Sequence, residues 1–195
     1  MVKFSLGIGL GRDGVGMGEA SDLFKSAAEH HRAGRLSVAE TGYRDVLTMN
    51  PRHANALHML GIVLSARNED EAAIEYIRKA LIEQPDDQNF LNNYGVLCKK
   101  LDRLELAITA YREALARDPG YIDAAYNLAN ALAESGEVFE AIDLYDDILK
   151  RAPDNPQARA NLANAYQKIG RLDDAAVEIQ RLIDRETDAA AHYNN

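Results

Sequence analysis

The segment Ala124-Ala125-Tyr126-Asn127-Leu128-Ala129-Asn130-Ala131, followed by Asp143-Leu144-Tyr145 and then Pro153, is the clearest copy of a pattern that recurs along this chain of 195 residues. Four prolines mark the period: Pro51, Pro85, Pro119 and Pro153 lie 34 residues apart. If each proline is numbered position 32, there are five repeats at residues 20–53, 54–87, 88–121, 122–155 and 156–189, with Thr187 replacing the fifth proline. Such a period is typical of stacked supersecondary units that bury their apolar faces against one another.

Other columns share this phase. Position 20 is always alanine, and position 8 is always glycine or alanine, which allows two helix backbones to approach closely. Position 15 is Gly, Asn or Asp, residues that tolerate a left-handed conformation after a helix end: Gly34, Asn68, Asp102, Gly136 and Gly170. Each repeat is therefore predicted to contain helix A over positions 2–14, a tight turn, and helix B over positions 17–30, which the proline ends.

Small residues at positions 8 and 20, an aromatic or aliphatic residue at position 24 and proline at position 32 resemble the tetratricopeptide repeat family, and the resemblance covers residues 20–189. It implies an all-α, right-handed superhelical solenoid of five helix-turn-helix repeats, with helix A of each repeat lining a concave groove. Departures are Val46, Ile148 and Leu182 at position 27, Tyr94 at position 7, and Ser26 at position 7 of the first repeat.

The two ends differ from the repeats. Residues 1–19 are glycine-rich and predicted to form a flexible leader, with the first helix starting near Ser21. The leader includes Gly9-Leu10-Gly11-Arg12-Asp13-Gly14, which matches a dinucleotide fingerprint but lacks the strand and helix that the fingerprint requires. Residues 190–195 resemble the start of another helix A, so we expect a truncated sixth repeat or a cap, and we hypothesise that the chain is the N-terminal part of a longer protein.

Composition narrows the function classes. The net charge is −9, and residues 122–195 carry 7 basic and 14 acidic side chains, which disfavours binding to nucleic acid. No apolar stretch is long enough to predict a membrane span. The single cysteine, Cys98, excludes an intrachain disulfide and favours a reducing compartment, so we expect a cytoplasmic protein.

Helix A positions 2, 5, 6, 9, 12 and 13 are expected to face the groove, where asparagine recurs. The candidate peptide-binding residues are Asn92, Asn93, Tyr126, Asn127, Asn130, Asn161, Asn164, Lys99 and Lys100. Asparagine inside a helix costs roughly 0.6 kcal/mol relative to alanine, so its recurrence calls for an explanation. One interpretation is a ladder of amides that pairs with the backbone of an extended peptide. The other is that the amides satisfy polar groups of the next repeat.

Groove cations suggest a partner charge. Lys25, His31 and Arg32, together with Lys99 and Lys100, would favour an acidic segment or a terminal carboxylate. The family has a form that clamps a C-terminal carboxylate with Lys and Asn, but here Lys25 is accompanied by Ala28, so that clamp is incomplete. Lys99 and Lys100 also fit a solvated helix end, where cations favour the helix dipole.

No residue pattern predicts chemistry. The histidines lack the spacing of a metal site, Cys98 is expected to be a buried thiol, and no nucleophile, base and acid fall into one pattern. We therefore predict no catalytic residue, no cofactor and no metal, and we do not expect this segment to be an enzyme.

Three functions are compatible with these features. The first is a protein-interaction scaffold that binds an extended peptide or a partner helix in the groove. The second rests on resemblance to bacterial proteins similar to O-GlcNAc transferase, in which such repeats form the N-terminal arm that presents substrates to a glycosyltransferase; related chains carry other transferases. The third is self-association, with the array ends stacking head to tail.

Overall fold

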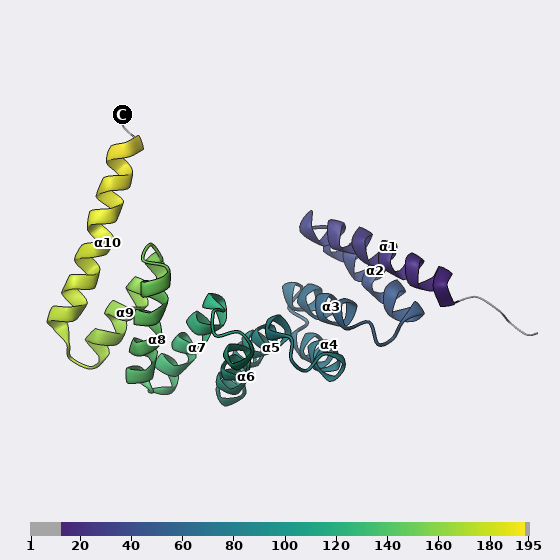
Figure 1. Ribbon diagram of the computed structural model, residues 1–195, viewed down its shortest axis with the longest axis horizontal. Coiled ribbons are helices and arrows are strands. Elements are labelled where there is room, and N and C mark those ends of the chain that lie inside the picture. The colour runs from purple at the N-terminus through teal and green to yellow at the C-terminus, as the bar shows by residue number, and fades with distance from the viewer. Residues whose placement is uncertain (1–12, 194–195) are drawn as a thin grey trace, which may run out of the picture. The chain divides into compact units, whose positions relative to one another are not determined.

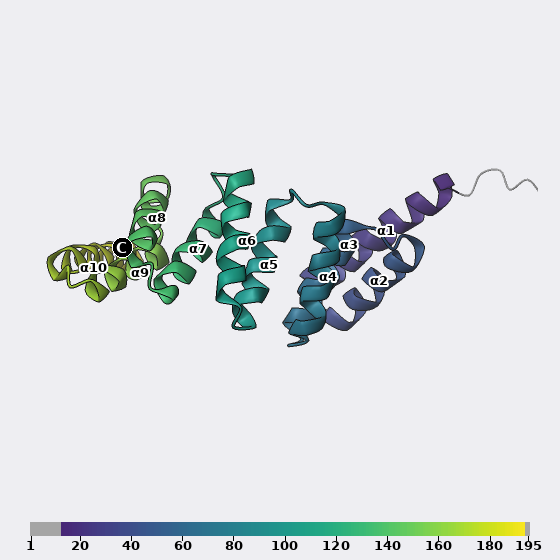
Figure 2. The same ribbon diagram turned by 90° about the horizontal axis from the view of Figure 1, so that it is seen from below.

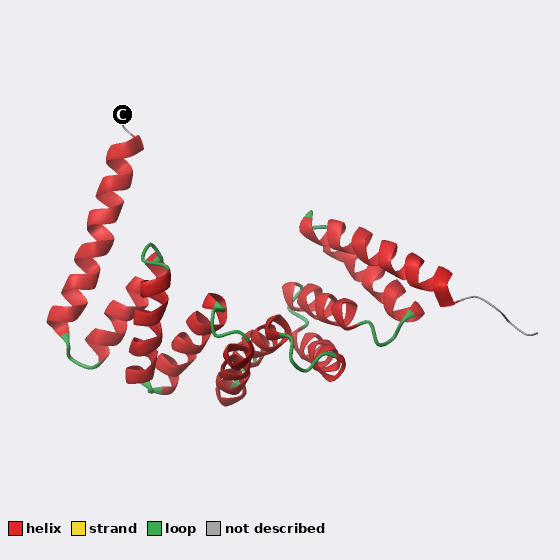
Figure 3. Cartoon of the chain, viewed as in Figure 1, coloured by secondary structure: helices red, strands yellow, loops and turns green. Residues whose placement is uncertain are grey.

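The computed structural model describes the backbone of residues 13–193 and the side chains of residues 18–185. Within the described backbone every regular element is an α-helix (Figure 3). The helices are α1 (Asp13–Arg32), α2 (Leu36–Met49), α3 (Ala54–Ala66), α4 (Asp70–Glu83), α5 (Gln88–Lys100), α6 (Leu104–Arg117), α7 (Ile122–Ser135), α8 (Val138–Arg151), α9 (Pro156–Lys168) and α10 (Leu172–Tyr193). No helix in this described part is long and apolar enough to cross a membrane.

The helices form two compact units (Figure 1). Unit 1, Met1–Pro85, contains α1 to α4, and each helix packs against the next. Unit 2, Asp86–Asn195, contains α5 to α10 with the same succession of contacts. In unit 2, α5 also contacts α7, and α7 contacts α9, so the first helices of the three repeats line up (Figure 2). We call this surface the A side of unit 2.

The turn between the two helices of each repeat adopts the predicted left-handed conformation. The position-15 residues have positive φ in every repeat: Gly34 at 72°, Asn68 at 64°, Asp102 at 58°, Gly136 at 97° and Gly170 at 77°. A positive φ reverses the chain directly after helix A, so that helix B can fold back along it. Asparagine and aspartate serve at two of these turns because their short polar side chains tolerate this region.

The repeat positions that hold small residues, positions 8 and 20, are the points where paired helices approach most closely. The position-20 alanines are almost completely buried: Ala39, Ala73, Ala107, Ala141 and Ala175. A Cβ on Gly61 would lie 2.6 Å from Cγ1 of Ile77, and a Cβ on Gly95 would lie 2.6 Å from Cε1 of Tyr111. Because real Cβ atoms do not approach that closely, Gly61 and Gly95 allow Ile77 and Tyr111 to pack directly against the backbone of helix A. Repeats one and four carry alanine at position 8 opposite a tyrosine, so the close approach belongs to the second and third repeats.

Proline determines where helix B ends. The second helices that precede a position-32 proline end at Met49, Glu83, Arg117 and Arg151. Thr187 has a backbone N–H and no ring to clash, and α10 continues past it without a break to Tyr193. Residues 190–193 therefore extend α10 (the yellow helix in Figure 1), and the prediction that a new helix A starts there is wrong; residues 194–195 lie outside the described part.

The first helix begins earlier than predicted. It starts at Asp13 rather than near Ser21, so Gly14, Gly16 and Gly18 lie inside α1. Glycine costs about 1 kcal/mol relative to alanine in a helix, which weakens a helix without forbidding it. The leader prediction is thus wrong for residues 13–19, and residues 1–12, with most of the dinucleotide-like match, lie outside the described residues.

Two buried glutamates join helices through arginine. Glu40 on α2 is 6% exposed and pairs with Arg44 and with Arg67, which follows the last residue of α3. Glu178 on α10 is 7% exposed and pairs at 2.6 Å with Arg159 of α9 and with Arg181. A buried carboxylate needs such partners because removing a charge from water costs several kcal/mol.

Candidate functional site

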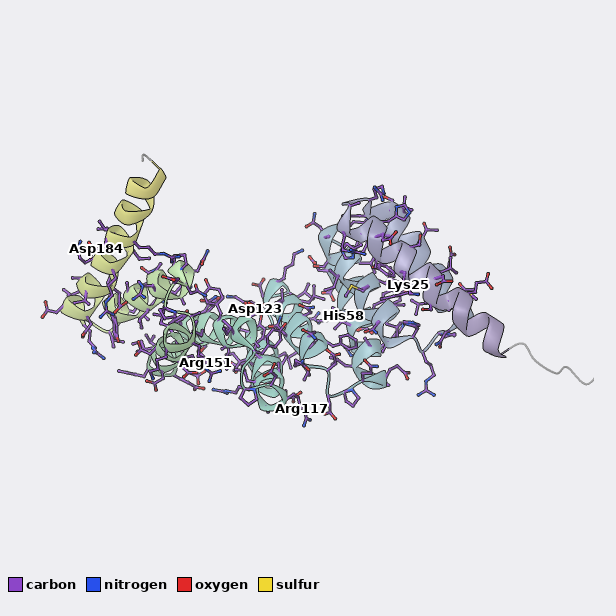
Figure 4. The ribbon with its side chains drawn as sticks, turned by 45° about the horizontal axis from the view of Figure 1, so that its top comes forward. Lys25, His58, Arg117, Asp123, Arg151 and Asp184 are labelled. Atoms are coloured by element: carbon purple, nitrogen blue, oxygen red, sulfur yellow. The ribbon has the colours of Figure 1, made fainter. Side chains whose placement is uncertain are left out.

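The candidate residues lie on the A side of unit 2, since helical spacing places positions 5, 6 and 9 on one face. Helix α5 carries Asn92 and Asn93, α7 carries Tyr126, Asn127 and Asn130, and α9 carries Asn161 and Asn164. Figure 4 labels Asp123 in the first turn of α7, at the start of this face. The structure therefore brings the predicted asparagines of three repeats onto one surface.

The first link in this row joins α5 and α7. Nδ2 of Asn127 donates to Oδ1 of Asn92 at 3.0 Å, and Asn92 is only 5% exposed. Nδ2 of Asn92 lies 3.4 Å from Oδ1 of half-buried Asn93, a long and weak hydrogen bond. Asn92 is therefore used for contact between repeats and has little surface to offer a ligand.

The second link joins α7 and α9. Nδ2 of Asn161 donates to Oδ1 of Asn130 at 2.7 Å and to the hydroxyl oxygen of Tyr126 at 3.0 Å. The hydroxyl of Tyr145, on α8, donates to the same Oδ1 of Asn130 at 2.6 Å. Oδ1 of Asn130 thus accepts two hydrogen bonds, one from its own repeat and one from the next.

Burial keeps Tyr145 in the form that this network needs. Loss of solvent raises the pKa of its hydroxyl well above the ordinary value, and the nearby Tyr126 raises it further, while the hydrogen bond with Asn161 acts in the opposite direction. The rings of Tyr126 and Tyr145 lie 6.4 Å apart at 63°, an edge-to-face contact. The Tyr145 hydroxyl therefore remains a proton donor to Asn130 at neutral pH.

These hydrogen bonds favour, for several amides, the second interpretation of the asparagine row, in which they satisfy the neighbouring repeat. Both donors of Asn161 are used within the chain, but its Oδ1 accepts no hydrogen bond from the described residues. Asn164 is exposed and its carboxamide makes no hydrogen bond within the described residues. Groups left for a ligand therefore lie on α9 and also on α7, where Oδ1 of Asn127 and Nδ2 of Asn130 make no hydrogen bond within the described residues.

A depression of about 330 Å³ opens beside these groups. It is lined by Asn130, Ala133, Glu134, Tyr145, Asn161, Asn164, Ala165 and Lys168, so it collects side chains from α7, α8 and α9. A volume of this size is at the lower end for small ligand sites and suits a few residues of a peptide. The depression combines three amides with unused hydrogen-bonding groups, one ammonium and one carboxylate.

The lysines are placed differently from the prediction of a cationic groove. Nζ of Lys99 lies 2.9 Å from Oε2 of Glu134, so its charge is balanced by the next repeat, and Lys100 is exposed in the last turn of α5. Lys168, which was not singled out from the sequence, lines the depression and donates from Nζ to the carbonyl oxygen of Ala133 at 2.9 Å. The pairing of Lys99 with Glu134 leaves this part of the surface close to neutral.

Tyr145 and Glu134 are further lining residues that were not singled out from the sequence. Tyr145 occupies position 24, where large side chains recur, and it is buried at 1% exposed. Only its hydroxyl reaches the amide row. Glu134 and Lys168 occupy position 13, one of the predicted groove positions, and that position was the signal for them.

The described residues of unit 1 form no equivalent row of amides. Tyr43 corresponds to Tyr145 and is completely buried, but position 9 is Ala28, and the Tyr43 hydroxyl has no hydrogen-bond partner among the described residues. The ring of Tyr43 contacts Phe24 at 5.7 Å and His31 at 6.2 Å. Figure 4 shows Lys25 on α1 and His58 on α3 in this unit.

The one thiol of the chain lies in the core. Cys98 is fully buried, as predicted, and burial raises the pKa of its thiol, which disfavours the reactive thiolate. Among residues 18–185, no three His, Cys, Asp or Glu side chains gather closely enough to hold a metal ion. The surface is thus suited to hydrogen bonding.

Paired helices with left-handed turns, small residues at the helix crossings and polar first helices define an α-helical repeat protein. The chain belongs to the tetratricopeptide repeat family. One family model described as tetratricopeptide repeat matches residues 24–89 and 99–156, and a second with the same description matches residues 138–194.

Solved structures share this fold. The crystal structure of MamA protein is 23% identical with a TM-score of 0.79, covering 88% of this chain and 94% of that chain. PilW, described as a widely conserved type IV pilus biogenesis factor, is 26% identical with a TM-score of 0.76, covering 86% and 78%. YrrB, described as a TPR protein with an unusual peptide-binding site, is 20% identical with a TM-score of 0.75, covering 85% and 86%.

No curated protein sequence matches the chain. The matches to tetratricopeptide models and structures do not add support for the resemblance to bacterial proteins similar to O-GlcNAc transferase.

Proposed function

We propose that this protein is an interaction scaffold that binds an extended peptide segment on the A side of unit 2, in the depression beside α9. The observation that carries the proposal is the coincidence of a depression of about 330 Å³ with the amides of Asn161 and Asn164, which keep unused hydrogen-bonding groups. Proteins of this repeat family bind protein partners, which supports the same class of function.

The available groups match a peptide backbone. Oδ1 of Asn161 offers an acceptor to a backbone N–H, and Asn164 offers both an acceptor and two donors. Lys168 uses one of its three ammonium protons on Ala133, so the others remain for a backbone carbonyl. An alternating set of donors and acceptors binds an extended chain through its main chain with little dependence on side-chain identity.

Charge narrows the ligand further. Lys99 and Glu134 balance each other beside the depression, and Lys168 faces the carbonyl end of α7. The site therefore favours a neutral segment over a strongly acidic one, in contrast to the cationic groove expected from the sequence. The binding free energy of such a contact is about −8 kcal/mol, which corresponds to a micromolar dissociation constant, as in transient interactions.

The test measures binding of short synthetic peptides of neutral, acidic and basic composition by calorimetry, with the best binder then compared among variants. Asn164→Ala removes an exposed amide with no hydrogen bond to the described residues, so it should weaken binding about tenfold, which equals about 1.4 kcal/mol, without lowering the unfolding midpoint. Gln180→Ala on α10 is the matched control, since it removes an exposed amide away from the depression.

A second probe separates backbone recognition from side-chain recognition. N-methylation of single peptide bonds in the best binder removes one donor at a time, and the bond that faces Asn161 should lose most affinity. If Asn164→Ala and every N-methylated peptide bind like their parents, the amides of α9 are not the binding surface and the proposal fails.

A further inference from the structure

The first repeat leaves exposed a surface that is covered in the later repeats. Positions 4, 7 and 11 of helix A are nearly buried in the second repeat, where Leu57, Leu60 and Leu64 are 5%, 0% and 1% exposed and α2 packs against α3. In the first repeat no helix of the described part of the chain packs there. The same positions hold Leu23, Ser26 and His30, of which Ser26 is exposed and the other two are half-buried.

These residues border an open depression of about 430 Å³ between α1 and α2. It is lined by Leu23, Ser26, Ala27, His30, Ser37, Val38, Thr41, Gly42 and Asp45. We call this surface the head face. The head face occupies the same repeat positions as the surface of α3 against which α2 packs. We therefore expect it to accommodate the second helix of a preceding repeat.

The last repeat exposes the complementary surface. Tyr43, Tyr111 and Tyr145 at position 24 are at most 1% exposed, and in each case the next helix A packs against their helix. Ile179 occupies position 24 of α10 and is 38% exposed, although its side chain is as apolar as the others. Ile179, half-buried Leu182 beside it at position 27, and Asn164 on α9 form what we call the tail face.

The polar groups of the two faces match one of the two internal contacts, the contact between the fourth and fifth repeats. Inside unit 2, Asn130 at position 9 accepts a hydrogen bond from Asn161 at position 6 of the next repeat. The tail face presents Asn164 at position 9, and the position-6 residue of the first repeat is Lys25, whose side chain is 70% exposed, pairs with Asp22 at 3.2 Å and has further ammonium protons to donate. An ammonium donating to Oδ1 of Asn164 reproduces the internal hydrogen bond.

Charge favours pairing of unlike ends. Residues 1–85 carry 10 basic and 11 acidic side chains, whereas residues 86–195 carry 12 basic and 20 acidic side chains. Contact between two tail faces would bring two strongly acidic units together, while contact between a tail and a head places the acidic unit against a nearly neutral one.

From these matching surfaces we infer that the protein self-associates head to tail, with the tail face of one copy seated on the head face of a second copy. The contact is heterologous, because the two copies contribute different surfaces, so each copy keeps one open face for further growth. This inference goes beyond the proposed peptide binding and stands on other observations. The tail face and the peptide site share Asn164, so a bound peptide and a second copy would compete for it.

Two blocking variants test the inference by sedimentation velocity over a range of concentrations. Wild-type protein should gain mass beyond a dimer as concentration rises. Ser26→Glu places a carboxylate in the head face of every copy, and Ile179→Glu places one in the tail face of every copy, so each variant alone should stay monomeric. An equimolar mixture should form a dimer and grow no further, because only the tail of the first variant and the head of the second remain usable.

Controls keep the outcome decisive. Val177→Glu alters an exposed residue on the same helix outside the tail face and should assemble like wild type. If circular dichroism shows that Ile179→Glu is poorly folded, Ile179→Ser replaces it and should weaken association at least tenfold. Peptide affinity, measured at a concentration at which wild type is monomeric, should be the same in Ile179→Glu as in wild type, which separates this inference from the proposed function.

Three results would overturn the inference. They are a wild-type protein that is monomeric at all concentrations, blocking variants that stay monomeric when mixed although wild type assembles, and loss of assembly in Val177→Glu. The second result would indicate a two-fold contact that contains both Ser26 and Ile179, and the third would place the contact on the outward face of α10.

Discussion

Two buried tyrosines at the same repeat position should respond in opposite directions when their hydroxyl groups are removed. The Tyr145 hydroxyl donates to Oδ1 of Asn130 at 2.6 Å, whereas the Tyr43 hydroxyl has no partner among the described residues. Tyrosine to phenylalanine removes only the hydroxyl and keeps the ring in its packing. The comparison therefore isolates the value of one hydrogen bond against the cost of one unsatisfied group.

The magnitudes follow from these contacts. In Tyr145→Phe the acceptor Asn130 keeps its 2.7 Å hydrogen bond from Asn161, so only the net value of one hydrogen bond is lost, about 1 kcal/mol. In Tyr43→Phe the buried hydroxyl that costs about 1–3 kcal/mol is removed, so we expect stabilisation of about 1 kcal/mol. The two variants should therefore differ by about 2 kcal/mol.

Unfolding should be followed by circular dichroism and by hydrogen exchange, because the chain has no tryptophan and repeat arrays do not always unfold in one step. Exchange should slow in α2 and α3 for Tyr43→Phe and accelerate in α7 to α9 for Tyr145→Phe. Loss of stability in Tyr43→Phe as large as that in Tyr145→Phe would show that the Tyr43 hydroxyl is satisfied after all, and would refute the reasoning.

The same pair carries a pH dependence. Burial raises the pKa of Tyr43 and of Tyr145 above the ordinary value of about 10. At a pH above about 10 the unfolded chain therefore releases these protons while the folded chain retains them, so the stabilisation present at neutral pH is lost progressively as pH rises. Wild type should lose stability in alkali more steeply than either phenylalanine variant, as measured by thermal unfolding between neutral pH and about pH 11.

Further substitutions test other features of the fold. Gly61→Ala should destabilise the fold by about 1–3 kcal/mol, because the added Cβ would lie 2.6 Å from a core side chain. Gly18→Ala should stabilise α1 by about 0.5–1 kcal/mol, because nothing lies within 4 Å of its added Cβ. Thermal unfolding of both variants measures the contrast. Arg67→Met leaves the buried Glu40 with one partner and should destabilise unit 1 by about 1–3 kcal/mol in urea unfolding, and an unchanged midpoint would show that the pair is dispensable. Thr187→Pro should end α10 before residue 187, seen as rapid amide exchange at residues 188–193, and persisting protection there would contradict the role assigned to the prolines.

Features set by local backbone geometry could be predicted from the sequence. The left-handed turns at Asn68 and Asp102 follow from the residue type and from their place after a helix end, without knowledge of the packing. The extent of α1 could not be predicted in this way, since Gly14, Gly16 and Gly18 indicate a loop in the sequence but only weaken a helix.

The candidate site was predictable in its surface but not in its hydrogen bonds. Asn127 at position 6 pairs with Asn92 at position 5 of the preceding repeat, whereas Asn161 at position 6 pairs with Asn130 at position 9 of the preceding repeat. The difference follows from Val96, which offers no acceptor at position 9 of the third repeat. Such choices depend on the residues of two repeats together and on the offset between their helices, which the period alone does not specify.

The buried glutamates were not predictable for a related reason. Glu40 occupies position 21 and Glu178 occupies position 23, so neither belongs to a recurring column. Each owes its burial to arginines whose contacts depend on the folded structure, as Arg67 reaches Glu40 from the end of the next helix A. A pattern that occurs once in an array gives no periodic signal.

The amide links between α5, α7 and α9 have a consequence for how such an array can change over evolutionary time. A repeat whose asparagine donates to its neighbour cannot be duplicated, deleted or exchanged freely, because the fifth repeat needs the acceptors Asn130 and Tyr126 of the fourth. Placed after a repeat with Val96 at position 9, Asn161 would lose one of its acceptors. Gene rearrangement in this half of the chain is therefore constrained to conserve the order of neighbours, and recombination libraries that shuffle these three repeats should yield few stable products.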